Sequence, residues 1–206
     1  GGGALAGEVA QVLGERGVKV AVLDLNQDKA EERARSIQER GGQAKAFACS
    51  VLEKRQLQEG ASRIQELWGG GDLLLNGAGG NDPRTSTEKE FLEARDLDRK
   101  DVFGFFDIDL GDFDQVFALN FTGTLVPTQV FSRGMAERGT GSIVNIASVN
   151  SLTPLTKIPA YSAAKAAVAN FTRWLAVHFS HVGVRVNALV PGFFMTEQLR
   201  FLHVDQ

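Results

Sequence analysis

Apolar segments alternate with amphipathic ones along this chain. Five short runs rich in aliphatic and β-branched residues have the length and continuous apolar character of buried strands. These runs span residues 18–25, 44–49, 72–76, 142–147 and 184–190. The stretches around them carry apolar residues at helical spacing, which predicts helices over 8–15, 27–40, 53–68, 112–137 and 158–180. Glycine pairs or triplets at 41–42 and 69–71 end two of these helices.

Strands that alternate with helices predict parallel βαβ units. We therefore expect an α/β fold of the Rossmann type, with one doubly wound parallel sheet and helices on both faces. In such a sheet, ligands bind beyond the carboxyl ends of the strands. The length of 206 residues suits one domain, and 43% hydrophobic residues can supply its core.

A tyrosine and a lysine four residues apart are the first candidates for chemistry. On a helix, Tyr161 and Lys165 lie on one face, so their side chains can converge. A phenol ionises at about pH 10, too high for acid/base work at neutral pH, and a neighbouring ammonium lowers that pKa. The spacing alone also suits an ordinary surface helix, so the pair needs support from the rest of the sequence.

Several further motifs stand at strand ends or inside helical patterns, in a fixed order. They are Asn76-Gly77-Ala78-Gly79, Asn120, Ser148, the pair Tyr161 and Lys165, and Pro191-Gly192 with Thr196 behind it. This ordered set resembles the short-chain dehydrogenase/reductase family over nearly the whole chain. Several spaced motifs in the right order are far more specific than any one of them.

The resemblance implies a site for hydride transfer to a carbonyl. Tyr161 would be the acid/base, and Lys165 would lower its pKa and hold the nicotinamide ribose. Ser148 would hydrogen-bond the substrate oxygen, and Asn120 would hold a water that links Lys165 to solvent. Taken singly, Ser148 also suits a strand-end hydroxyl that binds backbone, and Asn120 a residue at a helix bend.

A cofactor site is predicted where the glycine-rich start runs into a helix, because helix N-terminal amides favour a pyrophosphate. Ala4 and Ala6 stand where the family's Thr-Gly-x-x-x-Gly-x-Gly pattern has its last two glycines, so the pattern is incomplete. Asp24 ends a strand about twenty residues further on, where a carboxylate binds ribose hydroxyls and repels a 2′-phosphate. Leu25 and Asn26, which follow it, offer no cation for that phosphate, which predicts NAD rather than NADP. Asp24 also suits a helix N-terminus.

The resemblance implies cofactor contacts along most of the chain. Ser50, followed by Val51, replaces the aspartate that the family usually has beside the adenine, and Thr196 would meet the nicotinamide carboxamide. The complete set of expected cofactor-binding residues is Gly1, Gly3, Ala4, Leu5, Asp24, Ser50, Val51, Asn76, Gly77, Ala78, Tyr161, Lys165, Pro191, Gly192 and Thr196.

Residues 81–111 are an insertion on the substrate side that exceeds what the family usually has. A long insertion beside an active site is often a substrate wall or lid, and an oligomer contact or a solvated loop is the alternative. Arg84 in the insertion, and Asn150 and Lys157 in the segment before Tyr161, are candidates with Ser148 for binding a sugar acid. Considered alone, Lys157 suits a solvent-facing position.

The glycine run, the insertion and residues 76–81 and 153–162 are similar to one branch of the family, the D-mannonate oxidoreductases. This branch interconverts D-mannonate and D-fructuronate with NAD(H). A gluconate 5-dehydrogenase, a polyol dehydrogenase, or a non-catalytic NAD-binding sensor or scaffold are the alternatives. The family also implies a homotetramer or homodimer, for which the aromatic residues offer either interface or core: Phe113, Phe117, Phe121, Phe131, Phe171 and Trp174.

Composition narrows the choice of partners. A net charge of −3 argues against a nucleic-acid-binding surface, and no apolar run is long enough to span a membrane. The single cysteine, Cys49, cannot form an internal disulfide and fits a reducing cytoplasm. No carboxylate or cysteine stands at ligand spacing from His178 and His181, so no metal site is predicted.

In this family's sheet, a strand precedes the glycine-rich turn, and a helix and strand follow the Pro-Gly turn. The resemblance therefore implies a native protein that is longer at both ends, with 1–206 as its NAD-binding catalytic domain. Without the first strand, which is central, two neighbouring strands would be left unpaired. We expect an intact mass above that of the 206 residues alone.

Overall fold

The computed structural model describes residues 2–192. Its strands are β1 (Lys19–Asp24), β2 (Gln43–Ala48), β3 (Leu73–Asn76), β4 (Gly141–Ile146) and β5 (Val184–Leu189). Its α-helices are α1 (Ala4–Glu15), α2 (Gln27–Glu39), α3 (Lys54–Trp68), α4 (Leu110–Phe117), α5 (Gly123–Arg138) and α6 (Pro159–His178). Most bounds lie within two residues of those predicted, but α1 begins four residues earlier, so Ala4 and Leu5 belong to its first turn.

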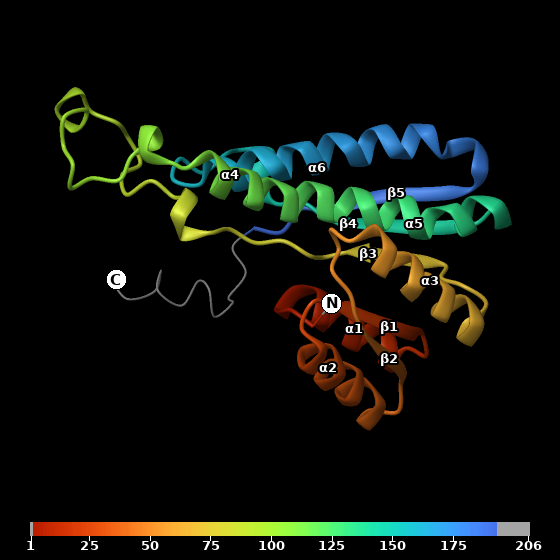
Figure 1. The fold of residues 1–206 in the computed structure, drawn as a ribbon. Helices are drawn as coiled ribbons and strands as arrows, with labels where there is room; N and C mark the ends of the chain where they lie inside the picture. The colour runs from red at the N-terminus through yellow and green to blue at the C-terminus, as the bar shows by residue number, and fades with distance from the viewer. Residues whose placement is uncertain (1, 193–206) are drawn as a thin grey trace.

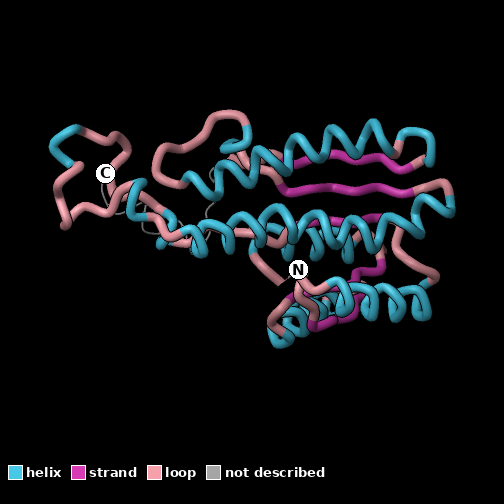
Figure 2. The backbone as a smooth tube through the Cα atoms, turned by 45° about the horizontal axis from the view of Figure 1, so that its top comes forward, coloured by secondary structure: helices cyan, strands magenta, loops and turns pink. Residues whose placement is uncertain are grey.

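All strand pairs are parallel, which confirms the α/β class. β1 pairs with β2, and β4 lies between β3 and β5. Figures 1 and 2 show α4, α5 and α6 running along the three-stranded sheet, while α1 and α2 accompany the two-stranded one. The ends of β3 and β4 therefore lie together, because Asn76 is in register with Asn145.

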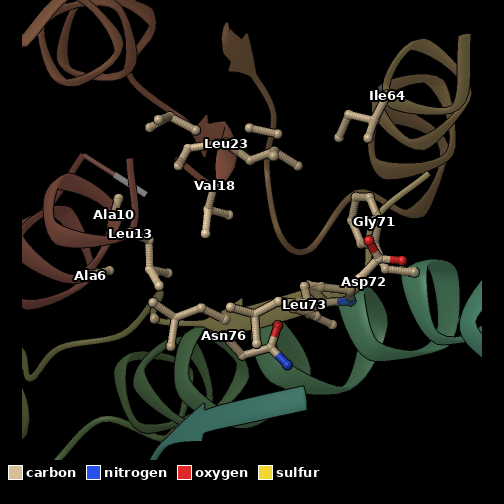
Figure 3. A pocket seen from close by; sticks show the side chains of 18 of the residues that line it. Ala6, Ala10, Leu13, Val18, Leu23, Ile64, Gly71, Asp72, Leu73 and Asn76 are labelled. Atoms are coloured by element: carbon tan, nitrogen blue, oxygen red, sulfur yellow. The ribbon is translucent and has the colours of Figure 1, made fainter. Parts of the chain in front are cut away.

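The strands form two sheets rather than the single sheet that was predicted. Within residues 2–192, β1 and β3 have no ladder partner on their facing edges. A cavity of about 510 Å³ lies between them, lined mainly by apolar side chains. Figure 3 shows Val18 on one side and Leu73 on the other bordering this space, with Leu13 of α1 beside them. The expected strand between these edges stays a prediction.

Each sheet has its own small core. Val22 and Ala44 of the two-stranded sheet pack against one apolar stripe of α2, formed by Ala30, Ala34 and Ile37. In the three-stranded sheet, Ile143, Val184 and Val186 pack with Met135 of α5 and Leu175 of α6. These two cores anchor the helices whose ends carry the predicted site.

The long helix predicted over 112–137 is interrupted. It begins at Leu110, since the Asp109 side chain caps it by accepting from Gly111 and Asp112 N–H at 2.8 and 3.1 Å. A π-helical segment, Ala118–Thr122, then separates α4 from α5. Inside this segment, the side-chain Nδ2 of Asn120 donates to the Val116 carbonyl at 2.8 Å. A side chain therefore binds a carbonyl of the helix backbone at this point. Such π segments are frequent at functional sites.

Candidate active site

Tyr161 and Lys165 lie in the first two turns of α6. The helix starts with Pro159, whose missing N–H costs nothing in the first turn. Ala160 and Ala164 are fully buried, so small side chains let this end of α6 lie close to the sheet. The Lys165 Nζ lies 5.5 Å from the centre of the Tyr161 ring, as the spacing predicted. Lys165 Nζ also donates to the Ile146 carbonyl at the end of β4, at 2.8 Å.

Burial dominates the electrostatics of this pair. It lowers the pKa of the Lys165 ammonium to about 8. Burial also raises the pKa of the Tyr161 phenol, and a hydrogen bond with Ser148 opposes this rise only in part. The expectation that Lys165 lowers the pKa of Tyr161 therefore differs from the structure. The physical reason is geometric, because the ammonium lies over the ring and binds a backbone carbonyl instead of the phenol oxygen.

Ser148 occupies the turn that leaves β4. It caps the short 3-10 turn Val149–Ser151, and its Oγ accepts from the Asn150 N–H at 3.2 Å. The Val149 N–H donates to the Pro191 carbonyl at 2.9 Å, so the ends of β4 and β5 are fastened together here. Ser148 also hydrogen-bonds Tyr161, and its expected bond to the substrate oxygen stays a prediction.

Asn120 is completely buried, and its side chain holds the segment after β3. Its Nδ2 donates to the Gly80 carbonyl at 2.7 Å, and its Oδ1 accepts from the Gly80 N–H at 3.2 Å. A Cβ added to Gly79 would lie 2.4 Å from Asn120 Oδ1 and 3.3 Å from Lys165 Nζ. Asn120, Gly79 and Lys165 thus meet at one point. The Asn120 side chain hydrogen-bonds the backbone of Gly80 and Val116, so its expected role in holding a water stays a prediction.

The glycine-rich start leads directly into α1. Gly3 precedes the helix, and no side chain caps its first amides. No acidic residue stands in the first turn either, which keeps the positive end of the helix dipole available for an anion. Gly77, which follows β3, lies close to the first turns of α1, because a Cβ on Gly77 would come within 2.6 Å of the Ala6 side chain. The residues present therefore fit a pyrophosphate at this helix end.

Asp24 ends β1 beside this helix. Its carboxylate accepts from the Gly2 N–H at 2.9 Å and from the Asn26 N–H at 3.0 Å. Burial raises the pKa of the carboxyl, but hydrogen bonds that include those from Asn26 and Gly2 outweigh burial and hold the pKa below its ordinary value. Asp24 is thus a fixed, ionised acceptor next to the start of α1, as a ribose ligand must be.

The other expected cofactor residues lie along the same edge of the strands. Ser50 follows β2 next to Asp24, since the Cys49 N–H donates to the Asp24 carbonyl at 2.8 Å. Its own N–H donates to Gln56 Oε1 at 2.8 Å, and its Oγ accepts from Leu52. Val51 lies against the start of α5, where a Cβ on Gly123 would come within 2.9 Å of it. Gly1 and Thr196 lie outside the described residues.

Asn76 is placed differently from the other cofactor candidates. Its Nδ2 donates to Thr128 Oγ1 and to Asn145 Oδ1, both at 2.9 Å. Asn145 in turn donates to Thr172 Oγ1 of α6 at 2.8 Å. The side-chain nitrogen of Asn76 is therefore engaged with α5 and β4, and its contact with a cofactor stays a prediction. The sequence motif gave no sign of this buried amide network, because Asn145 lies within an apolar strand.

The three further substrate candidates are already engaged in contacts. Arg84 pairs with Asp82 at 2.8 Å and with Asp112 of α4 at 2.5 Å. The Lys157 carbonyl accepts from the Thr87 N–H of the insertion at 2.9 Å, and its side chain is exposed. Asn150 is buried and donates to Ser162 Oγ at 3.3 Å. The roles of these residues in substrate binding stay predictions.

Residues 81–111 fold into an arm that extends past the start of α6 (Figure 1). The Glu88 N–H donates to the Phe103 carbonyl at 3.0 Å, which closes the arm on itself. Inside it, the Asp96 carboxylate is buried and accepts from Lys89 Nζ at 2.5 Å. The Thr87–Lys157 bond joins the arm to the segment before Tyr161, and a role of the insertion beside the substrate stays a prediction.

Comparison with known proteins identifies the family. The chain matches the short chain dehydrogenases over residues 1–205. It belongs to the short-chain dehydrogenase family. The chain therefore has the oxidoreductase class that its Tyr161–Lys165 pair predicted. An uncharacterised oxidoreductase of Haemophilus influenzae is 46% identical over 197 residues, which are 96% of this chain and 68% of that relative.

Two solved structures of oxidoreductases have the same fold as this chain. One from Haemophilus, provisionally described as a D-mannonate oxidoreductase and containing bound NAD, has a TM-score of 0.93 at 46% identity. The match covers 99% of this chain and 72% of that one. A gluconate 5-dehydrogenase from Burkholderia cenocepacia, in complex with NADP and tartrate, has a TM-score of 0.82 at 27% identity, with the same coverage of 99% and 72%.

Proposed function

We propose that this short-chain dehydrogenase is an NAD(H)-dependent sugar-acid oxidoreductase that interconverts D-fructuronate and D-mannonate. The observation that carries the proposal is the contact of Tyr161 with both Lys165 and Ser148 at the end of β4. The 46% identity to the NAD-containing Haemophilus protein supports the substrate class. The arm at 81–111 and the segment before Tyr161 supply the polar groups for a sugar acid.

The chemistry follows from the residues that meet there. In the bound state the nicotinamide would supply the hydride. Tyr161 would give its phenolic proton to the carbonyl oxygen as that oxygen gains charge, and Ser148 would hydrogen-bond the same oxygen. Lys165, buried with Asn120 beside Gly79, would hold the nicotinamide ribose.

NAD is proposed rather than NADP because of Asp24. Its ionised carboxylate, fixed by two backbone N–H groups, would accept hydrogen bonds from the ribose and repel a 2′-phosphate. The initial rates with NADH and NADPH test this point. Equal or better turnover with NADPH would contradict the assignment, and Asp24→Ala should reduce the preference for NADH.

A substrate panel followed by the loss of NADH absorbance tests the function itself. D-fructuronate, 5-ketogluconate and simple ketoses are its first members. We expect the highest kcat/KM with D-fructuronate. Preference for 5-ketogluconate or for a ketose would assign the chain to a gluconate 5-dehydrogenase or polyol dehydrogenase, in line with its likeness to the Burkholderia enzyme. NADH binding without any turnover would indicate a sensor or scaffold.

We also propose that the enzyme is a cytoplasmic homotetramer or homodimer. No helix within residues 2–192 is long and apolar enough to cross a membrane. A row of aromatic rings runs along α6, with Phe171 stacked on Trp174 at 6.3 Å and Trp174 on His178 at 4.5 Å. Trp174 of this row is exposed, and so is Val177 on the same helix, which supports an interface along α6. Phe131 instead lines the cavity between the two sheets.

A further inference from the structure

Asn150 connects the Ser148 turn to the helix that carries Tyr161. The residue is only 4% exposed, and its Nδ2 donates to Ser162 Oγ at 3.3 Å. Ser162 follows Tyr161 directly on α6 and is itself buried. This hydrogen bond therefore joins the turn after β4 to the first turn of α6, one residue away from the phenol.

The same residue orients the Ser148 hydroxyl. The Asn150 N–H donates to Ser148 Oγ at 3.2 Å and so occupies one acceptor position of that oxygen. The hydroxyl hydrogen is left for Tyr161, to which Ser148 hydrogen-bonds. A shift of Asn150 would move the oxygen of Ser148 with it, because the two residues share one tight turn.

Other hydrogen bonds of the turn go to residues outside α6, although the turn also packs against this helix. The N–H and the Oγ of Ser151 both donate to the Ser148 carbonyl, at 2.9 and 2.6 Å, within the turn. The Val149 N–H donates to the Pro191 carbonyl beyond β5. Among the hydrogen bonds of the described residues, the Asn150–Ser162 bond thus joins residues 149–151 to α6, beside the Ser148–Tyr161 bond and the Lys165–Ile146 bond just before the turn.

We propose that Asn150 is a positioning residue, which fastens the turn to α6 and thereby holds the Ser148 hydroxyl on the Tyr161 phenol. The proposal deepens the proposed function and rests on it for the role of Tyr161 as acid/base. It also separates two roles for Asn150. A substrate ligand would change the KM for the sugar acid, whereas a positioning residue changes the ionisation of Tyr161 and kcat.

The chain offers a direct measurement, because Tyr161 is its single tyrosine. The ultraviolet absorbance change on phenolate formation therefore reports this residue alone, in the absence of any substrate, with Tyr161→Phe as the blank. Asn150→Ala and Ser162→Ala each remove the same hydrogen bond from one side. We expect both to raise the midpoint of the phenol titration by about one unit, since each weakens the bond that stabilises the phenolate.

Two controls sharpen this measurement. The double variant should shift the midpoint no further than Asn150→Ala does, because both changes remove one shared bond. Ser180→Ala removes an exposed serine hydroxyl just beyond the far end of α6 and should keep the wild-type midpoint. If Asn150→Ala does not fold, as judged by circular dichroism, Ser162→Ala gives the same test.

Turnover provides the second readout. In the NADH assay, kcat should fall roughly 10-fold to 100-fold in Asn150→Ala and Ser162→Ala, with the KM for the sugar acid unchanged. An unchanged midpoint would overturn the proposal, whether KM rises, as for a substrate ligand, or stays the same. If the wild type turns over none of the panel, the proposed function fails, but the titration still decides the role of Asn150.

Discussion

Burial, more than charge pairing, determines the state of the two central side chains. Lys165 is 4% exposed, and its pKa is lowered to about 8, while burial raises the pKa of Tyr161. Both side chains are therefore kept closer to their neutral forms than in water. A neutral phenol is the form that donates a proton to a carbonyl oxygen, so this environment suits reduction.

Tyr161→Phe removes only the phenolic oxygen and should leave the fold intact. We expect kcat to fall by roughly 10²-fold or more, because the acid/base is lost, while NADH binds as before. Steady-state rates and NADH fluorescence measure the two effects separately. Retained turnover in this variant would rule out Tyr161 as the acid/base.

Lys165 should make the stability of the fold depend on pH. Its pKa is lower in the folded chain, about 8, than its ordinary value of 10.5, so between these values the unfolded chain binds more protons. The free energy of unfolding should therefore gain a rising contribution from about pH 8 to 10.5, and none below that range. Denaturant unfolding at a series of pH values measures it.

Comparison of variants isolates this contribution. Lys165→Met should remove the rise, whereas Lys45→Met, at an exposed position of β2, should keep it. The buried thiol of Cys49, whose pKa is raised by burial, acts in the opposite direction but equally in all three proteins. The same pH slope in wild type and Lys165→Met would contradict the assignment.

Junctions between elements, more than their interiors, assemble the site. Asn120 is buried within the π segment. Its side chain forms two hydrogen bonds with the backbone of Gly80, which follows β3. Gly79 and Gly80 have φ values of 154° and 155°, which side chains rarely adopt. Only Gly79 faces Asn120 and Lys165, whereas a Cβ on Gly80 would meet open space.

These two glycines form a matched pair for a test of that junction. Gly79→Ala should lower kcat by roughly 10²-fold, because its Cβ would displace Asn120 and Lys165. Gly80→Ala imposes a similar backbone strain without that collision, so its kcat should fall less. Stability measured by thermal unfolding should drop similarly in both variants. Equal losses of kcat would show that strain alone, and not the collision, is responsible.

At the scale of the whole molecule, the described residues form two separate sheets and an arm (Figure 1). β1 and β2 with α1 and α2 carry the residues expected to bind the dinucleotide. β3–β5 with α4–α6 carry the residues proposed for acid/base chemistry (Figure 1). The arm extends from the second part, beside the start of α6. Its exposed large apolar side chains include Phe91, Phe106 and Leu110. The aromatic row on α6 is a second exposed apolar surface.

Trp174 should be central to an assembly through α6. Trp174→Glu would place a charge within the exposed aromatic row and should lower the mass measured by light scattering to that of a smaller species. Leu67→Glu changes an equally exposed apolar residue on α3 and should leave the mass unchanged. A mass unaffected by Trp174→Glu would exclude this face as the interface.

The sequence by itself determined the α/β class, the bounds of most elements and the residues that meet at the candidate site. It could do so because strand and helix periodicities, and a tyrosine and lysine one turn apart, are local properties of the chain. It also placed Asp24 at a strand end beside the glycine-rich start.

Only the tertiary structure decided how these residues act on one another. The separation of β1 from β3, the π segment at Asn120 and the amide network from Asn76 through Asn145 all depend on contacts between distant segments. The same holds for the pKa of Tyr161, because its burial results from how α6 packs on the sheet. Burial is a sum over many distant neighbours, so no local spacing of residues can predict it.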